Sequence, residues 1–321
     1  MLTPLQGAQV QSVTTVNELI LELSHNCDLA CVMCGFGGGK VSPEKFMTIE
    51  TVGRVLEAVH PAPRVVRLNG RGESTIHPRF VEILQLVRGR YPEVQINLFS
   101  HLSMTAVRVM DALIENDVQM FVSMDSPDPE RFAAIRKRGR YSSVVANLDR
   151  LKNTARRPFI IFTLQESNFD DVVPMARFCV EHQLHFLVNT VRRDEGIEPF
   201  QQLVHERRDD LQRYFEEVNA IFSQQSVACY LPDRIQGVQT NSEGAQATYG
   251  GRQRCPAIDR EICVLFDGTV TPCNMFNPYV YGNILTESLA EIRAGARFQW
   301  FTENHKSHPY CSNCACLGGT A

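Results

Sequence analysis

The sequence predicts an α/β fold in two parts, a partial (β/α)6 barrel over residues 1–232 and a small α+β extension over residues 233–321. Segments with strand and helix patterns alternate about six times between residues 18 and 191, which is typical of a parallel sheet with right-handed crossovers. Six units suit an open barrel better than a closed one of eight. Residues 233–253 are polar and rich in Gly, Ser and Gln, as expected of a linker, and a cysteine-rich segment follows them.

The strands and helices follow from the spacing of apolar residues. Strands are expected at residues 18–24, 65–68, 94–99, 120–124, 159–164 and 185–191. Helices are expected between them at 49–59, 79–88, 106–115, 141–152 and 172–182, and a longer helix at 207–223. In this order the helices cover the outside of the sheet, and the carboxyl ends of the strands share one edge.

Composition narrows the class of protein. The chain has 321 residues and a net charge of −4, which gives no indication of nucleic-acid binding. The sequence has no run of 18 uncharged apolar residues and no secretory signal pattern, so we expect a cytoplasmic protein without a membrane span. Eleven cysteines in such a chain favour metal ligation over disulfides. Cys179 and Cys229 stand apart from the rest and are expected to be small buried side chains.

The first cysteine group follows the first predicted strand. Cys27, Cys31 and Cys34 have the spacing Cys-x3-Cys-x2-Cys. A structural zinc site needs four ligands, whereas three thiolates leave one iron of a [4Fe-4S] cube without a protein ligand. That iron can bind the amino and carboxylate groups of S-adenosylmethionine (SAM), and reduction then gives a 5′-deoxyadenosyl radical that removes hydrogen from unactivated carbon.

The segment LELSHNCDLACVMCG resembles the cluster-binding loop of the radical SAM superfamily. The resemblance implies a SAM pocket, with a glutamate motif after the second strand and an "SxD" segment after the fourth. The family usually has an aromatic residue before the third cysteine and Thr-Asn-Gly after the third strand, and this chain departs from both. The SAM contacts implied in this way are Met33, Gly72, Glu73, Ser100, Ser123 and Arg136. His25, His77 and His101 near strand ends are expected to be hydrogen-bonded loop residues.

The second cysteine group has the spacing Cys255-x12-Gly268-x4-Cys273, followed by Cys311-x2-Cys314. Asp267 and Gly268 mark the turn of a β-hairpin between the first two cysteines. Four thiolates suit either zinc or a fully ligated [4Fe-4S] cluster, and ligand number alone does not separate them. The spacing strongly resembles the Twitch form of the SPASM extension, which implies an auxiliary [4Fe-4S] cluster and a cluster-binding role for this part.

Three functions remain open from the sequence. The first is a radical SAM enzyme that dehydrogenates or epimerises a small polar substrate of the sugar, aminoglycoside or nucleoside type. Only about 17 residues precede the first strand, which argues against an N-terminal peptide-binding domain. Cys263 and Cys316 are candidate hydrogen donors, and a flavodoxin- or ferredoxin-type protein is the expected electron donor. The alternatives are a peptide or protein maturase and a non-catalytic zinc or iron–sulfur protein.

Overall fold

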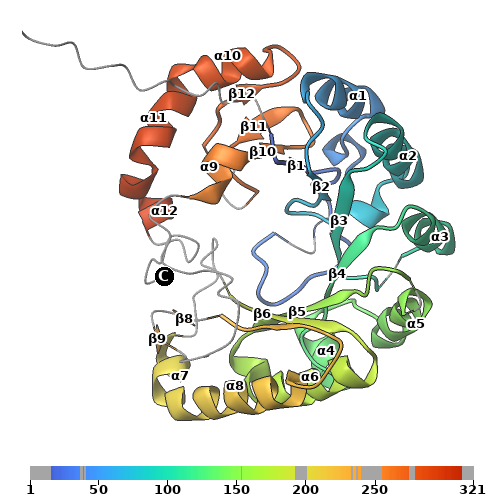
Figure 1. Ribbon diagram of the computed structural model, residues 1–321, viewed down its shortest axis with the longest axis vertical. Coiled ribbons are helices and arrows are strands. Elements are labelled where there is room, and N and C mark those ends of the chain that lie inside the picture. The colour runs from blue at the N-terminus through green and yellow to red at the C-terminus, as the bar shows by residue number, and fades with distance from the viewer. Residues whose placement is uncertain are drawn as a thin grey trace, which may run out of the picture.

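The computed structural model describes residues 16–36, 39, 41–103, 105–152, 154–191, 201–232, 234–235, 238–239, 255–274 and 279–312. Within them a curved sheet has the strand order β12-β11-β10-β1-β2-β3-β4-β5-β6-β7 (Figure 1). Its strands are β1 (Glu18–Leu21), β2 (Val65–Leu68), β3 (Gln95–Ser100), β4 (Gln119–Ser123), β5 (Phe159–Leu164), β6 (His185–Thr190), β7 (Cys229–Tyr230), β10 (Glu261–Val264), β11 (Thr269–Thr271) and β12 (Gly282–Asn283). A separate short ribbon pairs β8 (Arg234–Ile235) with β9 (Val238–Gln239).

Helices cover the outer, convex face of the curved sheet, and the loop after β1 lies on its inner, concave side (Figure 1). The helices are α1 (Ile49–Ala58), α2 (Phe80–Arg90), α3 (Val107–Glu115), α4 (Pro129–Ile135), α5 (Tyr141–Leu151), α6 (Val172–Glu181), α7 (Gln201–Glu206), α8 (Arg208–Phe222), α9 (Pro256–Arg260), α10 (Leu289–Ala294), α11 (Ala296–Asn304) and α12 (Pro309–Ser312). The expected alternation is confirmed, and most element ends lie within a residue or two of the prediction. The first strand is the exception: it ends at Leu21, three residues early, because the chain leaves the sheet there for the cysteine loop.

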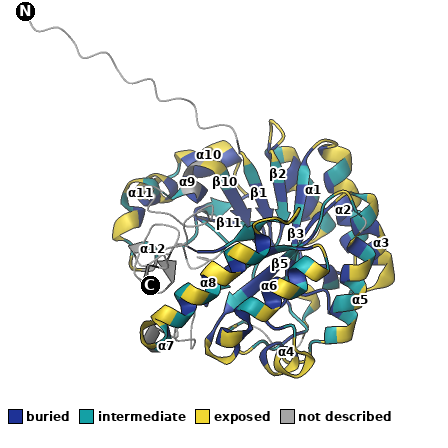
Figure 2. Cartoon of the chain, turned by 60° about the horizontal axis from the view of Figure 1, so that its bottom comes forward, coloured by how far each residue is buried: buried dark blue, intermediate teal, exposed yellow. Residues whose placement is uncertain are grey.

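Alternating side chains divide the sheet into two faces. In β3, Ile96 and Leu98 are fully buried under the helices, whereas Asn97 and Phe99 are half-buried on the inner face. Burial of this kind against amphipathic helices such as α1 is the main stabilising contribution (Figure 2). Within the described residues no helix is both long enough and apolar enough to span a membrane.

A ladder of aromatic rings crosses the inner face. Phe99 stacks on Phe121 at 4.5 Å, Phe121 on Phe159 at 5.0 Å, and Phe159 on His185 at 4.5 Å between ring centroids. Each pair is also a cross-strand pair in the register of the sheet. The ladder therefore ties four neighbouring strands together on the side away from the helices.

The extension continues the sheet of the barrel. β10 pairs in parallel with β1, from Glu18 beside Glu261 to Leu21 beside Val264. β11 and β12 then add antiparallel strands, which confirms the predicted hairpin. Its turn closes with the Gly268 amide donating to Leu265 O at 2.9 Å, and Gly268 has a φ of +84°, a conformation that glycine adopts readily.

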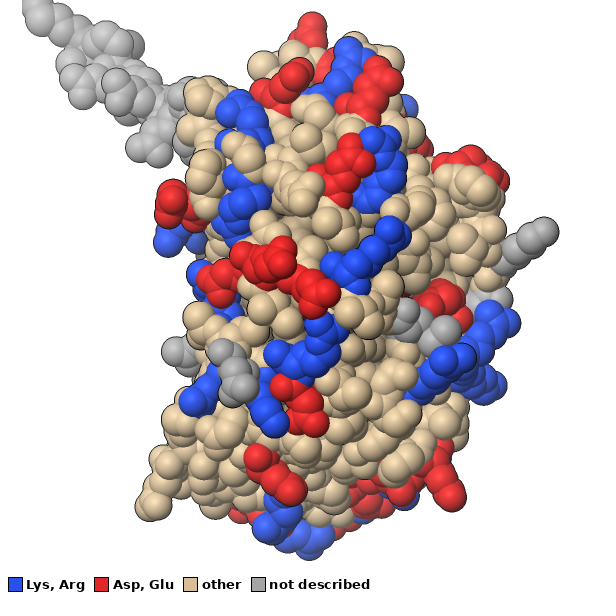
Figure 3. Space-filling view, turned by 90° about the vertical axis from the view of Figure 1, so that its right-hand side faces the viewer, with Lys and Arg blue, Asp and Glu red and all other residues tan. Residues whose placement is uncertain are grey.

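Acidic and basic side chains are interspersed on the face formed by the right-hand side of Figure 1, as Figure 3 shows. Several of them form surface ion pairs there, including Arg150 with Asp111 and Arg156 with Asp117. Exposed pairs of this kind contribute little to stability. The candidate functional residues lie instead on the inner face of the sheet and in its loops.

Candidate active site

The first cysteine loop is held by the segment that follows α4. The Ala30 amide donates to Lys137 O at 3.0 Å and the Val32 amide to Ile135 O at 2.9 Å. These bonds fix the backbone between the three cysteines. Cys27 and Cys31 are half-buried and Cys34 is exposed, so the three thiols line a surface that a cofactor can reach.

Gly72 lets the second strand's loop approach the cysteine loop. A Cβ at this position would lie 2.2 Å from Ser24 O and 2.4 Å from Asn26 O, distances that real contacts do not allow. The next amide, of Glu73, donates to Asn26 O at 2.8 Å. The resemblance implies that Gly72 contacts SAM, and within the protein its backbone lies against the chain just before Cys27.

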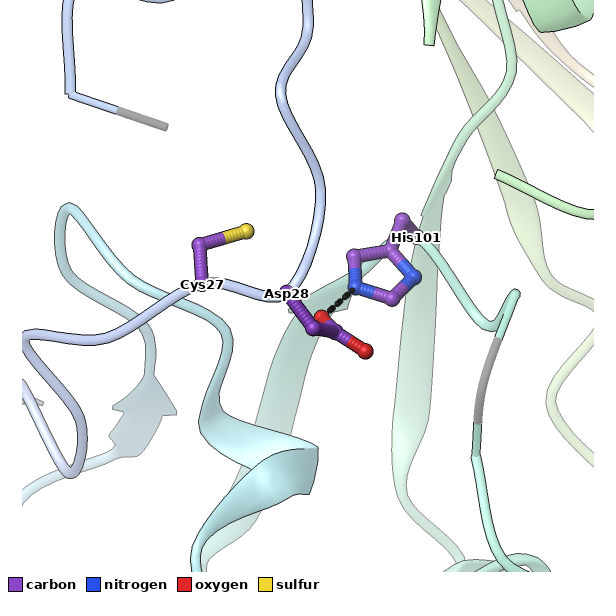
Figure 4. Close-up of side chains that lie close together, drawn as sticks. All are labelled: Cys27, Asp28 and His101. Atoms are coloured by element: carbon purple, nitrogen blue, oxygen red, sulfur yellow. Dashed lines mark hydrogen bonds and ion pairs between the residues drawn. The ribbon is translucent and has the colours of Figure 1, made fainter. Parts of the chain in front are cut away.

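Glu73 and His101 join three loops at the carboxyl edge of the sheet. Glu73 is buried, and its Oε2 accepts from the His101 amide at 3.1 Å. His101 Nε2 lies 2.9 Å from Asp28 Oδ1 (Figure 4). It lies 3.4 Å from Glu73 Oε2. Burial lowers the pKa of His101 and the two carboxylates raise it. The Ser103 amide donates to Nδ1 at 3.0 Å, however, so the ring carries its proton on Nε2, toward the carboxylates.

A second buried pair reaches the cluster loop from β4. Arg136 Nε donates to Asp125 Oδ2 at 2.6 Å, and its Nη1 lies 3.7 Å from Cys31 Sγ. Asp125 Oδ1 accepts from the Thr163 amide at 2.8 Å, and the Asn168 side chain donates to Asp125 O at 2.8 Å. The ends of β4 and β5 thus hold a guanidinium against Cys31, a predicted cluster ligand.

The other implied SAM contacts are distributed over the same edge. Met33 is half-buried in the cysteine loop, and Ser123 is half-buried on the inner face at the end of β4. Ser100 is buried, and its hydroxyl accepts from the Leu102 amide at 3.0 Å, which holds a turn. Their roles as SAM contacts, and that of Arg136, stay predictions.

The second cysteine group lies in the extension. Cys255, Cys273 and Cys311 are half-buried, while Cys314 and Cys316 lie outside the described residues. The hydroxyl of Tyr281 is buried, and none of the described residues bonds to it. Burial raises the pKa of Tyr281, and negative charge on Cys273, Cys255, Tyr279 and Cys311 raises it further, so these groups lie in the neighbourhood of the phenol. A buried hydroxyl donor without an acceptor is consistent with a site that binds a cluster, because the sulfur atoms of the cluster can accept its hydrogen bond.

The spacing of the thiols fits clusters better than zinc. A single zinc with thiolates at about 2.3 Å holds them roughly 3.8 Å apart. Among the described residues, the group whose ligand atoms all lie within 4.8 Å is Cys27, Asp28 and His101, and it includes one cysteine only. Both cysteine trios are wider than this, as a four-iron cube requires.

These features define a class: an enzyme built on a partial barrel, with an open-sided cluster loop after the first strand and a second cluster site in a C-terminal extension. Two family models match the chain, the radical SAM superfamily over residues 21–179 and the SPASM iron–sulfur cluster-binding domain over residues 255–315. The chain belongs to the radical SAM superfamily and carries a SPASM domain. It binds a [4Fe-4S] cluster, SAM and an auxiliary iron–sulfur cluster.

Similar proteins have varied substrates. A GTP 3′,8-cyclase of Pseudomonas entomophila is 28% identical over 174 residues, which is 53% of this chain and 52% of the relative. The chain thus spans about half the length of the cyclases that it matches. The sporulation killing factor maturation protein SkfB of Bacillus subtilis is 21% identical over 93% of this chain and 68% of its own length.

Two solved structures share the fold. Streptococcus suis SuiB bound to SAM superposes with a TM-score of 0.72 at 14% identity, covering 95% of this chain and 72% of SuiB. BtrN, in complex with AdoMet and 2-DOIA, superposes with a TM-score of 0.51 at 12% identity, covering 95% of each chain. At these identities the likeness concerns the fold alone.

Sequence reasoning missed two features of the site. The prediction that His101 is a hydrogen-bonded loop residue is confirmed. Its position as the link between Glu73 and Asp28 was not predicted. Tyr281 was not predicted as part of the site either. The signal in the sequence that could have drawn attention to it is its position next to Gly282 in the extension. Both depend on contacts between segments far apart in the chain.

Proposed function

We propose that this chain epimerises a small polyhydroxylated molecule, such as a sugar, aminoglycoside or nucleoside, and that Cys263 returns the hydrogen atom. The observation that carries the proposal is the position of Cys263. Ile262 and Val264 belong to the main core under the helices, whereas Cys263 forms a separate cluster with Ile20 and Leu265. Since neighbours in a strand face opposite sides, Cys263 lies on the inner face, where we expect SAM chemistry to take place.

The surroundings of Cys263 suit a hydrogen-atom donor. The side chain is fully buried, and its cross-strand partner in β11 is Thr271. Burial raises the pKa of this thiol far above neutrality, so it keeps its proton. Charge on Cys273 also acts on it, which indicates that the auxiliary cluster site is near.

The proposed reaction balances. When bound, the first cluster supplies the electron that splits SAM into methionine and a 5′-deoxyadenosyl radical. One hydrogen atom of a substrate C–H bond would be transferred to it, and the Cys263 thiol would return one to the opposite face of the carbon. The resulting thiyl radical takes up one electron and one proton, and a flavodoxin- or ferredoxin-type protein in the cytoplasm is the proposed source of electrons.

The inner face supports a polar, uncharged substrate. Asn69, Ser123 and Thr163 stand on it at or near the carboxyl ends of β2, β4 and β5. The side-chain oxygen of Asn69 is buried, and none of the described residues bonds to it. Amides and hydroxyls at this edge are suited to bind the hydroxyl groups of a sugar ring.

The test is turnover of candidate sugars and aminoglycosides in D2O by the reconstituted enzyme. We expect one deuterium at the inverted carbon. Cys263→Ala should still form 5′-deoxyadenosine but lose both the inverted product and the deuterium. Cys229→Ala serves as a control, because Cys229 lies on β7, which is far from β10 in the strand order. Inversion that persists in Cys263→Ala would contradict the role of the thiol. Loss of two hydrogens from the product would instead indicate dehydrogenation, in which the substrate radical gives up a proton and an electron.

A peptide maturase is the second candidate. It is favoured by SkfB, whose name describes maturation of a killing factor, and by SuiB, which has been solved bound to the precursor peptide SuiA. The same assay with candidate precursor peptides distinguishes the two. A crosslinked or thioether product, with sugars left unchanged, would replace the first proposal.

A further inference from the structure

We propose that the Tyr281 hydroxyl donates a hydrogen bond to a sulfur of the auxiliary cluster and thereby raises its reduction potential. This goes beyond cluster ligation, because it assigns to one side chain outside the cysteine pattern a role in electron transfer. It holds whichever substrate the enzyme uses.

The backbone places Tyr281 beside the second cysteine group. Its amide donates to Val270 O at 2.8 Å, and Val270 pairs with Gly282 in the register of β11 and β12. This sets Tyr281 next to Thr271, two residues before Cys273. The position is therefore fixed by the sheet and does not depend on a loop.

The ring is held by aromatic packing. Phe298 lies 4.9 Å from it, Phe301 5.8 Å and Tyr279 6.0 Å, all at steep interplanar angles. The side chain is only 7% exposed. Rings on this side offer no strong acceptor, and among the described residues the hydroxyl has no hydrogen-bond partner. The ionisable groups near enough to act on the phenol electrostatically are the thiols of Cys273, Cys255 and Cys311 and the hydroxyl of Tyr279.

A buried hydroxyl without an acceptor is unfavourable, and thiolate or sulfide sulfurs of a cluster would remove that cost. Reduction adds negative charge to the cluster, so a donated hydrogen bond stabilises the reduced form more than the oxidised form. Hydrogen bonds to the sulfurs are among the factors that set such potentials. Removal of the hydroxyl alone should therefore make the cluster harder to reduce.

The experiment uses Tyr281→Phe in the full chain, in a background of Cys27→Ala, Cys31→Ala and Cys34→Ala that leaves only the auxiliary cluster. Tyr279→Phe is the matched control, since the Tyr279 hydroxyl donates to Arg297 O at 3.0 Å. An EPR-monitored redox titration should show an equilibrium constant for reduction about tenfold lower in Tyr281→Phe, which corresponds to a shift of about −59 mV for one electron. Tyr279→Phe should match the parent chain.

Pulsed EPR gives a second readout. An exchangeable proton coupled to the reduced cluster should be present in the parent and in Tyr279→Phe, and absent in Tyr281→Phe. If Tyr281→Phe fails to take up iron, the apoproteins are compared. Without its orphaned hydroxyl, the variant apoprotein should melt at a higher temperature than the parent. An unchanged potential with the coupled proton retained, or an apoprotein that melts lower, would overturn the proposal.

Discussion

At the scale of single residues, the site depends on a buried charge pair. Asp125 is completely buried and Arg136 nearly so, and the guanidinium bridges Asp125 and the region of Cys31. Burial raises the pKa of the Cys31 thiol and the Arg136 cation lowers it. Arg136 therefore favours the thiolate that a cluster needs and the Asp125 carboxylate opposes it, while each partner of the pair is costly to bury without the other.

Arg136→Gln should destabilise the apoprotein by about 3–5 kcal/mol, because it leaves the Asp125 carboxylate buried without a cation. The double variant Asp125→Asn/Arg136→Gln should recover part of that loss, since it removes both charges. Lys137→Gln is the control of equal charge change, and its exposed side chain predicts an effect within about 0.5 kcal/mol. Anaerobic urea unfolding measures all three. Similar losses for Arg136→Gln and Lys137→Gln would show that the pair is not important.

The sequence predicts the chemistry of single residues better than their partners. The cysteine loop could be predicted because its ligands lie within eight residues of one another. The family resemblance assigns Arg136 and Ser100 to SAM by position, and within the protein their side chains contact Asp125, Cys31 and the Leu102 amide. Such pairings join separate β/α units, and a single sequence carries no information on them.

At the scale of elements, the carboxyl ends of β1, β2 and β3 are tied together by backbone contacts. Gly72 presses on the chain at Ser24 and Asn26, and Glu73 links that contact to His101 after β3. Strands and helices themselves were predictable because apolar spacing is local. The parallel pairing of β10 with β1 was not, because the two strands are about 240 residues apart and their pattern alone does not specify a neighbour.

Gly72→Ala should reduce cluster uptake severely, because its methyl group cannot fit against Ser24 O without moving the cysteine loop. Gly53→Ala, in α1, is the matched control: a Cβ there meets nothing within 4 Å, and alanine should stabilise the helix by about 1 kcal/mol. Iron and sulfide content after anaerobic reconstitution, together with the melting temperature, gives the comparison. Normal cluster content in Gly72→Ala would mean that the two loops can separate without loss of the site.

At the scale of the whole molecule, barrel and extension share one sheet. The boundary expected near residue 233 divides the chain by composition, but β10 lies directly beside β1. At this seam Glu261 stands next to Glu18, which pairs with Arg67. Burial raises the pKa of Glu261, and the charge of Glu18 raises it further against the opposing effect of Arg67. The seam is therefore more stable when Glu261 is protonated.

This gives a pH dependence that reports on the whole fold. Because the folded-state pKa is raised, the contribution of Glu261 to stability is complete below its unfolded value of about 4.3 and is lost as the pH rises through the folded value. Glu261→Gln should thus raise the melting temperature at pH 8 and much less at pH 4. Glu57→Gln, on the exposed side of α1, should change neither. If the seam joins the two parts into one cooperative unit, a single transition shifts. If only a minor transition moves, the extension unfolds independently of the barrel despite the shared sheet.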